Sequence, residues 1–297
     1  MADPELYGAI ELGGTKIVMA VGRGDGTILT KASIATRSPD LAIAEMKAFF
    51  CRPGLNLAGL GVGAFGPIVI DRQSRDFGRL LETNKPGWSG FDLVQALTTA
   101  VGLPVRLFTD VGAAAIGEAR SGALKGVQLG LYLTVGTGIG GAILSDGEIL
   151  PALLHPEMGH IALHRQAGDL APSACQFHDS CAEGLAAGPA IMARFGKSLS
   201  DFPGGSAEQA LIADYLGQLC AQLVLTLSPH RIVIGGGVGK TPGLHELVMA
   251  AMRDRLGGYA LPAVSLPGFL QPPLLGQDAG IVGALIAASK SQQLTHS

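Results

Sequence analysis

A strand–turn–strand unit whose turn is rich in glycine and threonine occurs twice in the chain, near residues 7–26 and 129–147. In both copies an apolar strand ends in the turn, a second apolar strand follows, and an Asp-Gly pair closes the unit. Repetition of one supersecondary unit is typical of proteins built from two related parts. We therefore predict an α/β protein with two related lobes that face each other across a cleft.

The chain has 297 residues, which is enough for two domains with well-filled cores. We expect residues 1–111 and a terminal helix at about 281–297 to form a smaller N-terminal lobe, and residues 112–280 to form a larger one. Hydrophobic spacing predicts further elements, namely helices over 41–50, 92–101 and 112–120 and strands over 57–63, 105–108 and 231–234.

The charge balance excludes several classes of partner. A formal net charge of −3 and a pI of about 6.2 give no general attraction to nucleic acid or to an anionic membrane. The first residues, MADPELYGAI, lack the cationic and apolar regions of a signal peptide, and the apolar windows that we considered, residues 58–70 and 279–288, are too short to span a bilayer. We expect a cytoplasmic enzyme with no nucleic-acid or membrane partner.

Two glycine-rich motifs imitate nucleotide-binding fingerprints. Residues 136–141 satisfy G-x-G-x-x-G, but an apolar strand follows them where a dinucleotide-binding fold needs a helix. Residues 235–241 end in Gly-Lys-Thr like a phosphate-binding loop, yet Ile234 stands where its first glycine belongs. The two repeated turns remain, and their backbone N–H groups and threonine hydroxyls could hold phosphates. The alternative is that they are only tight hairpins.

A set of motifs spread over nearly the whole chain resembles the ROK family of sugar kinases. The motifs occur in the family's order: Glu11-Leu-Gly-Gly-Thr15, Thr109-Asp110, residues 134–141, Glu157-Met-Gly-His160, a Cys/His cluster at 175–181, residues 234–238 and residues 275–284. The resemblance implies an actin-like ATPase fold of the Hsp70 and hexokinase type. Glu11 at the start of the first motif and the spacing Cys-x-x-His-x-x-Cys are most similar to bacterial ROK fructokinases. Gly112 departs from the family, which usually has Asn there.

The resemblance implies roles for individual residues. Asp110 follows an apolar strand and is the expected general base, although it could instead be the N-cap of the helix that follows. The expected ATP- and phosphate-binding residues are Glu11, Gly13, Gly14, Thr15, Lys16, Thr134, Gly136, Thr137, Gly138, Gly235, Gly236 and Gly237, with Mg²⁺ facing Glu11. For the three glycines at 235–237, an ordinary strand–helix connection is the alternative. The expected sugar ligands are Asp110, Glu157, His160 and Glu183, and for Glu183 a plain surface charge is the alternative.

Four residues have the composition of a structural zinc site: His160, Cys175, His178 and Cys181. Two thiolates and two imidazoles suit a closed tetrahedral site, and no Cys-x-x-Cys redox pair or haem-attachment motif is present. His155 or His164 could replace His160, and a loop without metal is the alternative. We expect the metal to brace the sugar-binding residues, so that chelation raises the sugar KM and leaves the ATP site intact. Cys51 and Cys220 are expected to be buried thiols.

The expected activity is phosphorylation of a hexose by ATP, most simply D-fructose to fructose 6-phosphate, with Mg²⁺ and structural Zn²⁺ as cofactors. Glucose, mannose or an N-acetylhexosamine is the alternative substrate. A non-catalytic sugar-binding protein is a further possibility, whereas a repressor of this family needs a DNA-binding helical segment before Glu11, for which the sequence has no room. The expected partners are hexose, ATP and a second copy of the chain in a homodimer.

Overall fold

The computed structural model describes residues 5–150, 155–259 and 264–290, and it divides into two compact units. Unit 1 comprises the described residues of Met1–Gly122, Ile149–His155 and Leu275–Ser297, and unit 2 comprises those of Ala123–Glu148 and Pro156–Leu274. The first boundary thus follows Gly122, whereas the sequence placed it after residue 111. The expected terminal helix is observed as α10, Ala279–Ser289, and residues 291–297 lie outside the described part.

The sheet of unit 1 has five strands in the order β3-β2-β1-β4-β5. The first three are antiparallel, and β4 and β5 run parallel to β1. Their bounds are β1 Leu6–Leu12, β2 Lys16–Arg23, β3 Ile28–Ala35, β4 Leu57–Ala64 and β5 Val105–Thr109. Strand β3 was not predicted, because its alternate exposed residues give it no continuous apolar run.

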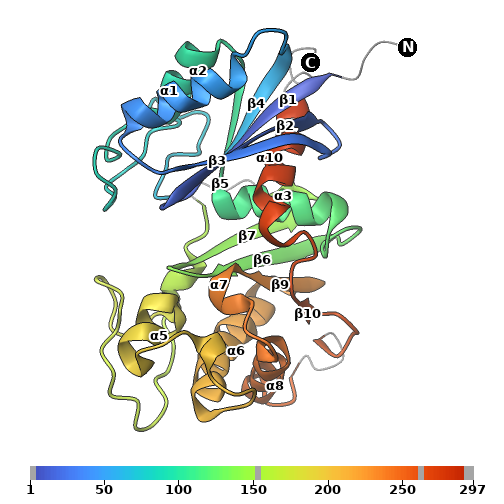
Figure 1. Cartoon of the computed structure of the whole chain (residues 1–297). Helices are drawn as coiled ribbons and strands as arrows, with labels where there is room; N and C mark the ends of the chain where they lie inside the picture. The colour runs from blue at the N-terminus through green and yellow to red at the C-terminus, as the bar shows by residue number, and fades with distance from the viewer. Residues whose placement is uncertain (1–4, 151–154, 260–263, 291–297) are drawn as a thin grey trace. The chain divides into compact units, whose positions relative to one another are not determined.

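Helices cover both faces of this sheet (Figure 1). Side chains alternate along β1, so that Ile10 and Leu12 pack with α1 and α2, while Tyr7 and Ala9 pack with α10. Helix α3 crosses α10 at backbone contact, since a Cβ added to Gly117 would lie within 2.3 Å of the carbonyl oxygen of Ala279. This close crossing is the physical reason that α3 belongs to unit 1. The helix bounds are α1 Pro39–Phe50, α2 Leu93–Val101 and α3 Asp110–Ser121.

The sheet of unit 2 repeats the same topology, with the order β10-β9-β6-β7-β8. Strand β7 is antiparallel to the central strand β6, and β9 is parallel to it, as β2 and β4 are to β1. The predicted internal repeat is therefore confirmed. The strand bounds are β6 Leu129–Val135, β7 Ile139–Ser145, β8 Glu148–Ile149, β9 Arg231–Gly235 and β10 Leu270–Gln271.

The core of unit 2 forms around the long helix α6, Ala207–Leu227. By length and mean hydropathy α6 could cross a membrane, but 61% of the relevant window is buried in the protein, as expected for a core helix. The other helices are η1 Met158–His160, α4 Ala182–Ala186, α5 Gly188–Phe195, η2 Leu199–Asp201, α7 Gly236–Gly239 and α8 Leu244–Leu256, with η3 Gly276–Asp278 in unit 1. Cys220 is buried as expected, whereas Cys51 is exposed because it ends α1 at the surface.

Candidate active site

Asp110 is the first residue of α3, directly after β5. The N-cap of this helix is Thr109, whose hydroxyl accepts the N–H of Gly112 at 3.0 Å. The alternative role of Asp110 as the N-cap is therefore wrong. Burial raises the pKa of the Asp110 carboxyl, although the N–H of Val111 donates to it at 2.8 Å and opposes the rise. A carboxyl with a raised pKa at the end of a strand has the character of a general base.

Glu11 lies on β1 near this carboxyl. Its strand neighbour on β4 is Gly63, which has no side chain to separate β1 from the start of α3. The pKa of Glu11 is raised to about 6, first by burial and then by the charges of Asp110 and Asp278, while Lys16 opposes the rise. The Oε2 atom of Glu11 is buried and has no hydrogen-bond partner among the described residues. A buried, unpartnered carboxylate oxygen beside two other carboxylates fits a hard cation such as Mg²⁺.

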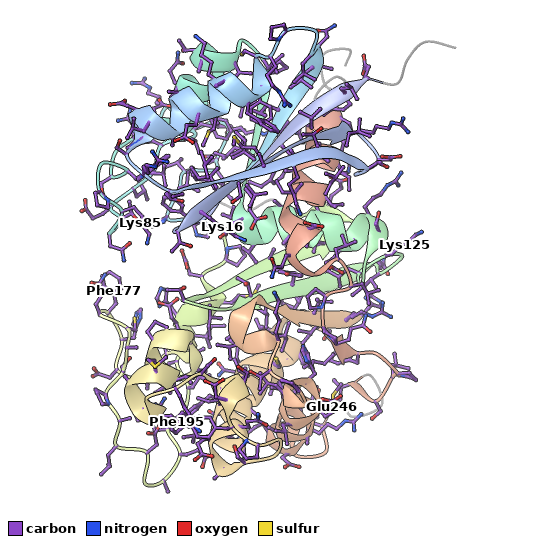
Figure 2. The ribbon with its side chains drawn as sticks, in the orientation of Figure 1. Lys16, Lys85, Lys125, Phe177, Phe195 and Glu246 are labelled. Atoms are coloured by element: carbon purple, nitrogen blue, oxygen red, sulfur yellow. The ribbon has the colours of Figure 1, made fainter. Side chains whose placement is uncertain are left out.

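The first glycine turn, Gly13 to Lys16, is held from behind by Thr36. Its hydroxyl donates to the carbonyl of Gly13 at 2.7 Å, and its N–H donates to the carbonyl of Thr15 at 3.0 Å. No described residue accepts a hydrogen bond from the N–H groups of Gly14 and Thr15. With Lys16 at the same end of the sheet (Figure 2), the turn offers unpaired backbone donors and a positive charge, which suit a phosphate.

The second glycine turn, Gly136 to Gly138, adjoins the glycines that follow β9. A Cβ added to Gly136 would lie 3.9 Å from the nitrogen of Gly237, and one added to Gly236 would lie 2.3 Å from the carbonyl oxygen of Val135. Gly236 has φ of +85°, which only glycine adopts readily. The structure thus brings two predicted ATP-binding segments together, although Gly236 and Gly237 begin the short helix α7 instead of forming an irregular turn.

Glu183 connects this second turn to the segment that carries the cysteines. It lies in the first turn of α4, and its Oε2 accepts the N–H of Ile139 at 3.0 Å, where β7 leaves the glycine turn. The N–H of Gly188 also donates to the carbonyl of Gly136 at 2.7 Å. The carboxylate of Glu183 therefore supports the second glycine turn, and the alternative of a plain surface charge is wrong.

Glu157 and His160 lie at the two ends of the short helix η1. The N–H of His160 donates to the carbonyl of Glu157 at 3.0 Å, which fixes the spacing of the two residues. The Glu157 side chain is exposed, whereas Met158 and Gly159 between them are buried against β7. The buried Met158 and Gly159 therefore anchor η1, while Glu157 and His160 point outward.

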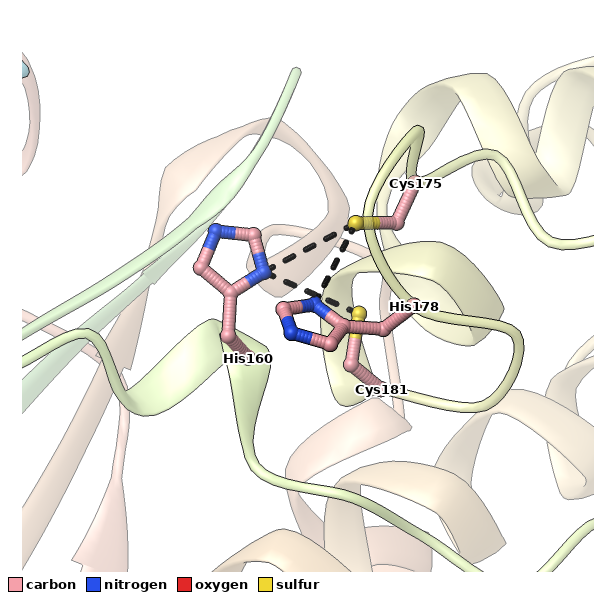
Figure 3. A group of neighbouring side chains, drawn as sticks. All are labelled: His160, Cys175, His178 and Cys181. Atoms are coloured by element: carbon pink, nitrogen blue, oxygen red, sulfur yellow. Dashed lines mark hydrogen bonds between the residues drawn. The ribbon is translucent and has the colours of Figure 1, made fainter.

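The four predicted metal ligands form one cluster. Figure 3 shows His160 of η1 pointing toward the side chains of Cys175, His178 and Cys181. The four ligand atoms lie within 4.8 Å of one another, and Nδ1 of His160 is 3.8 Å from the sulfur of each cysteine. Tetrahedral zinc with bonds of about 2.3 Å to sulfur and about 2.05 Å to nitrogen separates these atoms by about 3.6 Å. The donors and their spacing fit Zn²⁺, and His160 would bind through Nδ1.

The electrostatics of the cluster also favour a cation. The pKa of the Cys181 thiol is raised to about 11, first by burial and also by the neighbouring Cys175. Two adjacent thiols in such a place become thiolates only when a positive charge compensates them. His155 and His164, the two alternatives to His160 as a ligand, are not part of the cluster.

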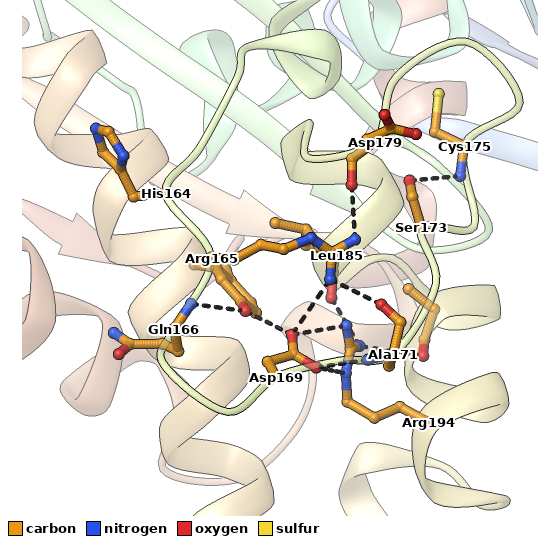
Figure 4. Close-up of polar contacts among 12 residues, drawn as sticks. His164, Arg165, Gln166, Asp169, Ala171, Ser173, Cys175, Asp179, Leu185 and Arg194 are labelled. Atoms are coloured by element: carbon orange, nitrogen blue, oxygen red, sulfur yellow. Dashed lines mark hydrogen bonds and ion pairs between the residues drawn. The ribbon is translucent and has the colours of Figure 1, made fainter.

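A network of polar contacts holds the loop between η1 and α4 (Figure 4). Its centre is Asp169, which accepts hydrogen bonds from the guanidinium of Arg194 at 3.1 Å and from the hydroxyl of Tyr215 at 2.5 Å. Burial opposes ionisation of Asp169, but these hydrogen bonds outweigh it and hold the pKa of the carboxyl below its usual range. Arg165 donates to the carbonyls of Ala171 and Asp179, so the network reaches the residues beside the metal ligands.

Sequence reasoning did not find every charged residue near the first turn. Asp278, at the end of η3, forms an ion pair with Lys31 of β3 and acts electrostatically on Glu11. Lys85 reaches over Gly14 from the loop after Leu81. The spacing of residues along the sequence does not reveal either role, because both residues come close to the turn only through tertiary packing.

The packing around Gly112 is tight, since a Cβ there would lie 3.0 Å from the Thr109 hydroxyl oxygen.

Comparison with known proteins identifies the family. Fructokinases of Pediococcus pentosaceus and Zymomonas mobilis are each 36% identical to this chain, over 283 and 293 residues, and the alignments cover 95% and 96% of this chain and 97% of each relative. The crystal structure of a ROK hexokinase from Thermus thermophilus is 29% identical, has a TM-score of 0.79 and covers 97% of this chain and 99% of that one. These similarities confirm the predicted fold class and resemblance. Since the ROK family model also matches residues 7–291, the chain belongs to the ROK family.

Proposed function

We propose that this protein is a kinase that transfers the terminal phosphoryl group of ATP to the 6-hydroxyl group of D-fructose. The observation that carries this proposal is the similarity to two fructokinases over nearly the entire chain. The raised pKa of the buried Asp110 carboxyl and the paired glycine turns supply the chemistry that such a reaction needs.

In the proposed reaction, the hydroxyl oxygen of the sugar attacks the terminal phosphorus of ATP. A new phosphorus–oxygen bond forms, the bond to the bridging oxygen of ADP breaks, and the hydroxyl proton moves to the carboxylate of Asp110. Asp110 then releases this proton to solvent. Burial of Asp110 supports the assignment because it raises the proton affinity of the carboxylate.

The ATP phosphates would bind to the backbone N–H groups of the two turns, through Gly13, Gly14 and Thr15 in unit 1 and Gly136, Thr137 and Gly138 in unit 2. Mg²⁺ supplies charge neutralisation on these phosphates when it is bound. Glu11, through its unpartnered Oε2, would hold that ion directly or through water. Lys16 and Thr134 would add a charge and a hydroxyl, and Gly235, Gly236 and Gly237 would let the nucleotide approach bare backbone.

The sugar would be recognised by hydrogen bonds from its hydroxyl groups to Asp110, Glu157, His160 and Glu183. His160 suits this role because zinc binding through Nδ1 leaves Nε2 available. Glu183 uses Oε2 for Ile139, which leaves Oε1 for a ligand. Zinc at the Cys/His cluster would be structural, since four protein ligands leave no open position. We also propose a cytoplasmic location and a homodimeric state.

A coupled assay of ADP formation across fructose, glucose, mannose and N-acetylhexosamines tests the substrate. We expect the highest kcat/KM with fructose, and a higher value with another hexose would assign that sugar instead. Asp110→Asn should lower kcat by about 10²–10⁴-fold while ADP and fructose still bind. Asp25→Asn, the same change at an exposed turn, is the control. Full activity of Asp110→Asn would exclude the proposed base.

A further inference from the structure

Lys85 belongs to a surface loop, residues 81–91, that is anchored by one buried side chain. Trp88 at its centre is fully buried, and its indole N–H donates to the carbonyl of Arg37 at 2.8 Å. The ring of Trp88 packs edge-on against Phe65 and Phe91. The N–H of Trp88 also donates to the carbonyl of Lys85 at 3.1 Å, so the buried tryptophan fixes the backbone of the lysine.

The side chain of Lys85 lies over the first glycine turn. A Cβ added to Gly14 would lie 3.0 Å from Cε and 3.3 Å from Nζ of Lys85, so any side chain at Gly14 would crowd the ammonium group. Lys85 is half-buried, and its ammonium group forms no hydrogen bond or ion pair with any residue in the described part of the chain. Lys31, by contrast, is neutralised by Asp278.

An unpaired ammonium group beside unpaired backbone donors is a site for an anion. The N–H groups of Gly14 and Thr15 have no acceptor among the described residues, and Lys85 approaches the same turn from a separate loop that the buried Trp88 anchors. Positive charge that is already in place costs no reorganisation when negative charge develops in a transition state. In a phosphoryl transfer this charge develops on the non-bridging oxygens of the group being transferred.

We propose that Lys85 is a further catalytic residue, whose ammonium group binds a non-bridging oxygen of the phosphoryl group during its transfer. This inference rests on the proposed kinase function. Lys85 takes up and releases no proton in this role and forms no covalent bond. The oxygen it contacts can belong to the terminal phosphate of ATP before transfer or to the sugar phosphate after it, and the binding measurements below separate these two sources.

The test compares Lys85→Met, which keeps the aliphatic packing over Gly14, with Lys85→Arg, which keeps the charge. Lys47→Met, on an exposed position of α1, is the control for loss of one positive charge. Isothermal titration calorimetry would measure binding of ADP, of the non-hydrolysable ATP analogue AMP-PNP, and of fructose 6-phosphate, each with Mg²⁺. Steady-state kinetics would give kcat and both KM values.

For Lys85→Met we expect a loss of about 100-fold in kcat, unchanged ADP affinity, and about tenfold weaker binding of AMP-PNP or of fructose 6-phosphate. Weaker AMP-PNP identifies the ATP phosphate as the partner, and weaker fructose 6-phosphate identifies the product. Lys85→Arg should restore anion binding. Unchanged kcat and unchanged binding of both anions would overturn the proposal, and so would a rise in the sugar KM alone. If the wild type phosphorylates no hexose, the proposed function fails, but AMP-PNP and ADP binding still decide whether Lys85 contacts a terminal phosphate.

Discussion

The buried ion pair between Arg194 and Asp169 should contribute far more to stability than the exposed pair between Arg255 and Asp214. The Arg194 and Asp169 side chains are 6% and 5% exposed, whereas those of Arg255 and Asp214 are 37% and 19% exposed. Both pairs belong to unit 2 and both place an arginine against an aspartate. Arg194→Ala and Arg255→Ala are therefore a matched test of burial.

The expected magnitudes follow from what each substitution leaves behind. Arg194→Ala removes two hydrogen bonds of 3.1 Å from the Asp169 carboxylate and leaves that charge buried, with the hydroxyl of Tyr215 and the N–H of Ala171 as donors and the more distant Arg165 as an ion-pair partner. It also removes the donor to the carbonyl of Leu185. Loss of one partner of a buried pair costs about 3–5 kcal/mol. For Arg255→Ala, water replaces the lost contact, and the expected cost is about 0–1 kcal/mol.

Thermal unfolding followed by circular dichroism, on protein supplied with Zn²⁺, gives the two shifts in Tm. Since 1 kcal/mol corresponds to about 2–4 °C for a domain of this size, we expect Arg194→Ala to lower Tm by about 6–20 °C and Arg255→Ala by at most about 4 °C. The difference should also appear in urea unfolding. Equal shifts for the two variants would refute the argument that burial makes the Asp169 network strong.

Three further results are expected. Because the pKa of Glu11 is raised to about 6, the magnesium-dependent kcat/KM for ATP should fall as the pH drops through about 6 and Glu11 becomes protonated. If the Glu11→Gln variant keeps this inflection in its pH profile, the inflection belongs to another group. Because the folded pKa is the raised one, the same group makes folding less favourable as pH rises from 4.5 to about 6, and Glu11→Gln should remove that slope from urea unfolding without metal. Chelation of the metal should weaken ADP binding several-fold as well as raise the sugar KM, because Glu183 supports Ile139 at the second turn; unchanged ADP affinity would restore the expectation of an independent ATP site. Gly61→Ala should lower the free energy of unfolding by at least about 2 kcal/mol, because the added Cβ would lie 1.9 Å from the carbonyl oxygen of Ala284. Gly204→Ala, where the added Cβ meets open space, should lower it little, and similar urea-unfolding midpoints for the two variants would contradict this packing argument.

The sequence was sufficient for features that follow from local pattern. The two turns, the helix after Asp110 and the spacing of Cys175, His178 and Cys181 are visible because strand ends, glycines and ligand intervals are local. The choice of His160 over two other histidines also proved compatible with the cluster geometry.

Features that depend on packing between distant segments could not be predicted. Lys85 and Gly14 are far apart in the chain, and the buried Trp88 anchors the loop that brings the lysine to the glycine. The sequence predicted the role of Glu183 only in part for the same reason, because its hydrogen-bond partner Ile139 is 44 residues away in the chain. The boundary at Gly122 depends on the contact between α3 and α10, which lie far apart in the sequence.

The repeated sheet allows each half of the protein to serve as a reference for the other. Glu11 on β1 and Thr134 on β6 occupy the same place, one residue before the turn, and each pairs with a glycine on the neighbouring parallel strand. The first turn has one residue more, because Gly13 to Lys16 separate the pair Leu12 and Ile17, whereas three residues separate Val135 and Ile139. Gly63 and Gly235 occupy this paired position in the two halves, so the glycine belongs to the architecture that both halves share. The carboxylate and the extra residue are where the two copies differ, and in the proposed function both serve the cation and the phosphates at the first turn.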